Sequence, residues 1–146
     1  LDFTVFNEDR TFTREEFTAF MYAQSVPDPG ALKLMGELAS RGRWRMMTMN
    51  NESAELNAHR VQLFGLRSIF SAFITSAYIG AQKPHPRFYD RALNISHAEP
   101  ERTVFIDDRE ENLEPARQRG LHCVHATSPE AVRIGLGVLG VLARDN

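Results

Sequence analysis

Short apolar runs alternate with amphipathic stretches along most of this sequence, and this alternation limits the fold more than any other feature. Short runs rich in β-branched and aromatic residues predict strands, and apolar residues three or four positions apart predict helices. Strands that alternate with helices of this length need crossover connections, which make the strands parallel. We therefore predict an α/β domain with a mostly parallel sheet, whose main strands cover residues 44–49, 72–75, 103–106 and 121–125.

Several residues indicate where the helices begin and end. Thr13 followed by Glu16 has the pattern of a capping box, and Gly120 stands where a glycine commonly ends a helix. Asn50 and Asn51 suit the cap of the helix that follows them. The predicted helices begin near residues 13, 31, 52, 86, 110 and 128.

Polar residues follow three of the predicted strands at the point where each strand ends. Ligands of a parallel α/β sheet bind beyond the carboxyl ends of its strands, so these residues predict one shared site. The three polar pairs are Asn50 and Asn51, Thr75 and Ser76, and Asp107 and Asp108.

The adjacent carboxylates of Asp107 and Asp108 predict a cation site. Like charges this close raise each other's pKa, and Mg²⁺, which prefers carboxylate oxygens and water, removes that repulsion. The alternative for the same pair is that one aspartate caps the next helix and the other is solvated.

Lys83 lies in the proline-stiffened turn 82–86, where a fixed ammonium would meet a phosphate or a carboxylate. Asn50 and Asn51 would contact a phosphate at a helix N-terminus, where backbone N–H groups also favour anions. Taken singly, the lysine is equally read as a solvated loop residue and the asparagines as simple caps.

Composition narrows the functional classes. The chain has 146 residues, a formal net charge of −2 and scattered arginines, which suits one domain and argues against a nucleic-acid partner. No apolar run approaches the ~20 residues that cross a bilayer, which argues against a membrane partner. The single cysteine, Cys123, predicts a reducing, cytoplasmic setting and a buried structural thiol.

Together, the polar end of one strand, the Lys-Pro turn and the strand that ends in Asp-Asp resemble the haloacid dehalogenase superfamily of phosphohydrolases. The segments that carry the resemblance are 49–51, 80–84 and 104–112, and it is nearest to the branch of haloacid dehalogenases and sugar-phosphate phosphatases. The resemblance implies a Rossmann-like three-layer sandwich whose cap domain is absent or vestigial.

The resemblance also implies roles for individual residues. Lys83 would hold the phosphate and neutralise the nucleophile, and Asp108 would be the Mg²⁺ ligand with Asp107 beside it. Asn50 and Asn51 would contact the phosphate. Asn112 would order the acidic loop. The implied ligand is phosphate or a small phosphorylated molecule, with Mg²⁺ as cofactor.

The sequence departs from the family at the first motif, D-x-D-G-T, whose first aspartate attacks phosphorus and whose second is the general acid and base. The nearest segment is 6–12, where Asn7 would replace the nucleophile and Asp9 would keep the acid/base position. The competing interpretation makes residues 1–28 a cap remnant or a replacement for the first strand and helix, with the core at 29–146.

If the central strand is missing, two strand edges are left unpaired. We expect residues 3–6 to fill the gap or a second chain to cover it, which favours a homodimer. Three functions follow: a family member impaired in catalysis that keeps Mg²⁺ or phosphate binding, part of an active Mg²⁺-dependent phosphatase or hydrolase, and a non-enzymatic interaction module.

Overall fold

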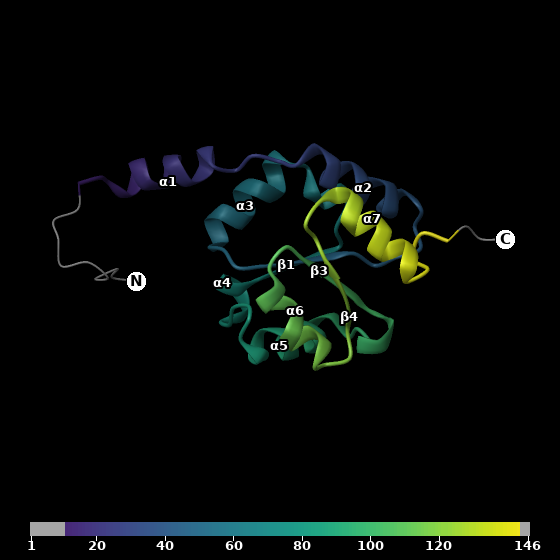
Figure 1. Cartoon of the computed structure of the whole chain (residues 1–146). Coiled ribbons are helices and arrows are strands. Elements are labelled where there is room, and N and C mark those ends of the chain that lie inside the picture. The colour runs from purple at the N-terminus through teal and green to yellow at the C-terminus, as the bar shows by residue number, and fades with distance from the viewer. Residues whose placement is uncertain (1–10, 144–146) are drawn as a thin grey trace.

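The computed structural model describes residues 11–143, which form three layers (Figure 1). The central layer holds β1 (Met47–Asn50), β2 (Ala72–Thr75), β3 (Val104–Asp107) and β4 (His122–His125). One face is covered by α2 (Pro29–Ser40), α3 (Ala54–Leu63) and α7 (Pro129–Val138), and the other by α4 (Ser76–Ile79), α5 (Pro86–Ser96) and α6 (Glu110–Arg117). The predicted α/β three-layer class is confirmed.

The four strands of the described residues are parallel within their pairs, and they form two separate two-stranded sheets. β1 pairs with β2, so that Asn50 lies opposite Thr75, and β3 pairs with β4, so that Asp107 lies opposite His125. The strands of the described residues thus form two parallel pairs, with one edge of β1 and one edge of β3 unpaired. The polar strand ends nevertheless come together at matching ends of the two pairs.

A large cavity lies between the two strand pairs. Its volume is about 1080 Å³, and its walls include residues of both β1 and β3 together with apolar side chains of α2, α5 and α7. The Thr48 hydroxyl of β1 is shielded from solvent and has no hydrogen-bond partner among the described residues. One edge of β1 and one edge of β3 therefore have no strand partner among the described residues, and both edges face this cavity.

Each face of the strands has its own apolar core. Phe88 and Tyr89 of α5 pack with Phe105 and Leu113 on one face, and all four are at most 5% exposed. On the other face, α2 and α7 enclose Val124. Burying side chains of this size contributes about 1.5–3 kcal/mol each, which explains why each strand pair holds its helices.

The helix caps confirm most of the predicted boundaries. The Thr13 hydroxyl accepts from the Glu16 N–H at 3.1 Å and the Glu16 carboxylate accepts from the Thr13 N–H at 2.7 Å, which completes the capping box of α1 (Arg14–Ala23). Gly120 adopts a positive φ of 83° after α6. The cap of α3 is Ser53, so the prediction that Asn50 and Asn51 cap this helix was wrong.

The N-terminal helix α1 has no buried residue and packs against α3, where Tyr22 stacks on His59 with ring centroids 3.9 Å apart. The predicted strand at residues 3–6 and the predicted positions Asn7 and Asp9 lie outside the described residues. The sequence signals also missed α4 and two single 3-10 turns, at Leu66–Ser68 and Pro100–Arg102.

Cys123 of β4 is half-buried and not fully buried as predicted, and its burial raises the pKa of the thiol. None of the helices within residues 11–143 is both long and apolar enough to cross a bilayer.

The contact between α7 and β4 predicts opposite effects for two glycines of the same helix. A methyl group at Gly135 would lie 2.7 Å from a Val124 methyl, whereas Gly137 has open space around it. We expect Gly135→Ala to lower the free energy of unfolding by about 1–3 kcal/mol through overpacking. Gly137→Ala should raise it by about 0.5–1 kcal/mol, because alanine favours the helix. Urea denaturation of both variants checks this, and equal effects would contradict the packing.

Candidate functional site

A buried ion pair between Lys83 and Asp107 forms the centre of the site. The Lys83 Nζ lies 2.6 Å from Asp107 Oδ2, and the two side chains are only 10% and 4% exposed. The ammonium also lies 5.6 Å from the centre of the Phe105 ring, which belongs to the wall of the cavity. Phe105 is therefore a residue of the cavity wall that lies close to the ammonium, while Lys83 and Asp107 do not themselves line the cavity.

The second carboxylate oxygen of Asp107 is held from the start of α6. Its Oδ1 accepts from Asn112 Nδ2 at 2.9 Å and from the Arg109 N–H at 3.0 Å. Burial alone would raise the pKa of this carboxyl, but the hydrogen bonds from Lys83, Asn112 and Arg109 lower it below its usual range. Asp107 is thus an ionised carboxylate fixed on both oxygens.

Asn51 holds the backbone of Lys83 at two points. Asn51 Nδ2 donates to the Lys83 carbonyl at 2.7 Å, and the Lys83 N–H donates to Asn51 Oδ1 at 2.8 Å. This pair of bonds links the end of β1 to the Lys-Pro turn. It sets the position of the lysine backbone, from which the ammonium reaches Asp107.

Asn50 enters a buried network on the opposite side of the chain from Asn51. Its Oδ1 accepts from the Thr75 hydroxyl at 2.9 Å, and its Nδ2 donates to Asn57 Oδ1 at 3.2 Å and to Glu52 Oε1. Both amide hydrogens of Asn50 are therefore used inside the protein. Its predicted contact with phosphate stays a prediction, and in this arrangement it would require one of these bonds to be exchanged.

Asp108 differs from its neighbour because its side chain is exposed and has no hydrogen-bond partner among the described residues. Its carbonyl oxygen lies 2.9 Å from His125 Nε2, which fixes the backbone at the end of β3. Within residues 11–143, no group of three or more acidic, histidine or cysteine side chains is placed to surround a metal. Asp108 and Asp107 fit Mg²⁺ only as a partial ligand set, of the kind that Mg²⁺ completes with water and substrate oxygens.

The sequence model of the haloacid dehalogenase-like hydrolases matches residues 3–120. The chain belongs to this family. The resemblance inferred from the Lys-Pro turn and the acidic pair is therefore confirmed at the level of the family.

The chain is similar in sequence to several enzymes with different names. The chain is 31% identical to bifunctional epoxide hydrolase 2 of Rattus norvegicus over 110 residues, which cover 73% of the chain and 20% of that protein. It is 28% identical to the pyrimidine 5'-nucleotidase YjjG of Escherichia coli, over 67% of the chain and 43% of the relative. The sesquiterpene phosphatase astK of Aspergillus oryzae is 28% identical over 69% of the chain and 51% of its own length. The chain thus spans about a fifth to a half of these relatives.

A solved structure supports the fold. The L-2-haloacid dehalogenase of Xanthobacter autotrophicus superposes with a TM-score of 0.66 at 24% identity, over 90% of this chain and 54% of that one. At this identity the likeness shows the fold of the haloacid dehalogenase-like domain and not its substrate.

The structure brings together most of the residues that the sequence predicted for the site. Lys83, Asp107, Asn112 and Asn51 are in direct contact, and Asp108 lies beside them. Sequence reasoning missed Glu52 and its partner Arg60, which had been read only as parts of a helix. A glutamate immediately after a polar strand end was the one signal that marked them.

The Lys83–Asp107 pair predicts a pH-dependent loss of stability in Lys83→Met. Removing the ammonium leaves a buried carboxylate uncompensated, so the free energy of unfolding should fall by about 3–5 kcal/mol at pH 7. Because the pair lowers the pKa of Asp107, its stabilisation is present above the ordinary aspartate pKa of about 3.9 and is lost as the pH falls through the folded-state value.

Chemical denaturation at pH 7 and pH 3 measures this difference, with Lys33→Met on the exposed face of α2 as the control. The gap between wild type and Lys83→Met should shrink at pH 3. A gap that is the same at both pH values would contradict the assignment.

Proposed function

We propose that this chain is a haloacid dehalogenase-type phosphohydrolase domain that binds phosphate and Mg²⁺ but, with its own carboxylates, does not turn over phosphate esters. The observation that carries the proposal is Lys83 at the polar ends of the strands, whose buried ammonium donates to Asp107 and whose backbone is held by Asn51. An ammonium has three N–H donors, so Lys83 could donate to a phosphate oxygen as well as to Asp107.

Phosphate suits this position better than a carboxylate ligand. The exposed Asp108 beside Lys83 would repel an anion unless a divalent cation lies between them, and a phosphate oxygen can bind such a cation as well as the lysine. Two of the relatives carry the names of a nucleotidase and a phosphatase, which supports a phosphorylated ligand.

Asp108, with Asp107 beside it, would hold the Mg²⁺. The ion would neutralise phosphate charge when bound. Asn112 and the Arg109 N–H keep the Asp107 carboxylate oriented, and Lys83 compensates its negative charge. These residues bind and orient, and none of them supplies a new bond to phosphorus.

The engagement of the Asp107 and Glu52 carboxylates by other residues of the described structure supports the catalytic part of the proposal. Both oxygens of Asp107 accept hydrogen bonds, and Glu52, a nearby carboxylate that feels the Lys83 charge, is engaged by Arg60. The sequence contains no D-x-D-G-T segment. An attacking carboxylate would have to come from outside the described residues.

A second candidate function follows from the cavity between β1 and β3. A further parallel strand in this space would satisfy both open edges, and its carboxyl end would lie near Lys83. The chain would then be part of an active hydrolase whose nucleophile is carried by that strand. Residues 3–6 or a second chain, as in a homodimer, are the occupants that the sequence suggested.

Hydrolysis of p-nitrophenyl phosphate by the purified chain, with and without Mg²⁺, separates the two candidates. The expected result is no turnover above that of Asp108→Asn, since both oxygens of Asp107 accept hydrogen bonds and Asp108 would serve as the Mg²⁺ ligand. Turnover that requires both Mg²⁺ and Asp108 would overturn the proposed impairment and favour the active hydrolase.

A further inference from the structure

Glu52, the residue that follows Asn51, carries a buried carboxylate. Its side chain is 5% exposed, and its Oε2 lies 3.2 Å from Arg60 Nη1. Burial raises the pKa of this carboxyl, and the Arg60 guanidinium opposes the rise. A buried ion pair usually adds little net stability, because desolvation offsets the attraction, so its place in the fold points to a role in orientation.

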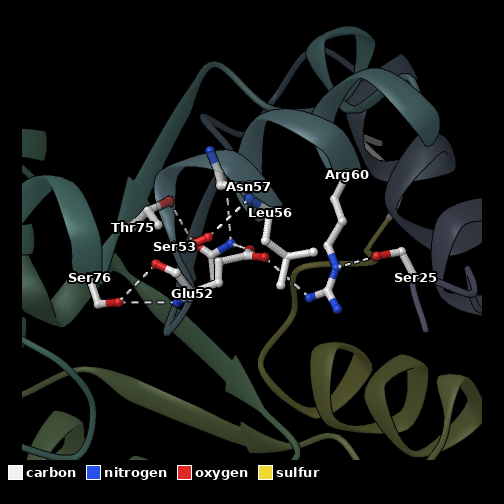
Figure 2. Close-up of polar contacts among 9 residues, drawn as sticks. Ser25, Glu52, Ser53, Leu56, Asn57, Arg60, Thr75 and Ser76 are labelled. Carbon is white, nitrogen blue, oxygen red and sulfur yellow. Dashed lines mark hydrogen bonds and ion pairs between the residues drawn. The ribbon is translucent and has the colours of Figure 1, made fainter. Parts of the chain in front are cut away.

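The backbone of Glu52 is fixed as well. Its N–H donates to the Ser76 hydroxyl at 3.1 Å, and that hydroxyl lies 3.2 Å from the Glu52 carbonyl oxygen, to which it can donate (Figure 2). Glu52 is therefore held at its main chain by α4 and at its carboxylate by α3. The start of the β1–α3 connection cannot shift without breaking one of these contacts.

The residue on the other side of Asn51 is anchored in the same direction. The Asn50 amide is held by Thr75, which is fully buried, and by Asn57, which is 5% exposed, and it also donates to Glu52 Oε1. Residues 50 and 52 thus face inward into one network. Asn51 between them is exposed and faces Lys83, as alternation along an extended chain requires.

We propose that Glu52 is a positioning residue that holds Asn51, and through Asn51 the Lys83 backbone, in the geometry used for phosphate. The inference rests on the proposed function only in taking phosphate as the ligand. The contacts that hold Asn51 and Lys83 in place involve no ligand. Glu52 acts by joining the Asn50 amide, the Arg60 guanidinium and the Ser76 hydroxyl around a single turn.

The network continues beyond the site to the N-terminal part of the chain. Arg60 Nε donates to the Ser25 hydroxyl at 3.1 Å, and Ser25, which is 8% exposed, lies in the segment between α1 and α2 (Figure 2). Arg60 is therefore oriented from two sides. Loss of the Ser25 hydroxyl should loosen the turn less than loss of the Glu52 charge.

Native-state hydrogen exchange measured by NMR tests the proposal without any ligand. The Lys83 amide reports on the clamp directly, because its N–H donates to Asn51 Oδ1. In Glu52→Gln we expect this amide to exchange at least about tenfold faster, which is the scale of a weakened charge-assisted contact. The His122 amide, which donates to the Thr103 carbonyl at 3.0 Å, should keep its rate.

Three further variants make the result decisive. Asn51→Ala gives the rate of an unclamped Lys83 amide, and Glu130→Gln removes an exposed carboxylate from α7 as a charge-matched control. Ser25→Ala, a milder change, should accelerate Lys83 exchange by a smaller factor and applies even if Glu52→Gln does not fold.

An unchanged Lys83 amide in both Glu52→Gln and Ser25→Ala would overturn the proposal. Equal acceleration of the Lys83 and His122 amides would also overturn it, because that pattern reports general destabilisation. Failure of the chain to bind phosphate would leave these exchange rates as they are, so the two failures are distinguishable.

Discussion

The contact between the Lys83 ammonium and the Asp107 carboxylate joins two halves of the molecule that share no strand pairing in the described structure. Lys83 follows the β1–β2 pair and is clamped by Asn51, whereas Asp107 ends β3 of the other pair. Burial of both charges is tolerated because each compensates the other and Asn112 completes the hydrogen bonding of Asp107. The site therefore depends on a bond that spans the division of the strands.

The family fold is kept in the described residues although the strands are divided into two pairs. The apolar cores on the two faces hold the helices against each strand pair, so the binding residues remain in place although β1 and β3 do not pair. The cavity between those strands is lined by Phe105, whose ring centre lies 5.6 Å from the Lys83 ammonium. The described structure keeps the contacts that orient the Lys83 and Asp107 charges.

Much of this arrangement was predictable from the sequence, because short-range rules govern it. The strand that ends in Asp107, the Lys-Pro turn and the Thr13 capping box depend on local pattern and were located correctly. The unmatched first motif predicts two unpaired strand edges, but which strands pair was not predictable in this way, since pairing depends on which strands are neighbours in space. The contact between Glu52 and Arg60 was also hidden, because the two residues lie eight positions apart in the sequence and only the start of α3 brings their side chains together.

The most direct test of the central claim is a titration with inorganic phosphate in the presence of Mg²⁺, followed by the amide resonances of wild type and Lys83→Gln, both with dispersed spectra. The account predicts that phosphate shifts the resonances of Asn51, Lys83 and Asp108 in the wild type, and that these shifts are lost in Lys83→Gln. Equal shifts in both proteins, or shifts confined to residues remote from Lys83, would contradict the claim that the Lys83–Asp107 pair forms a phosphate site.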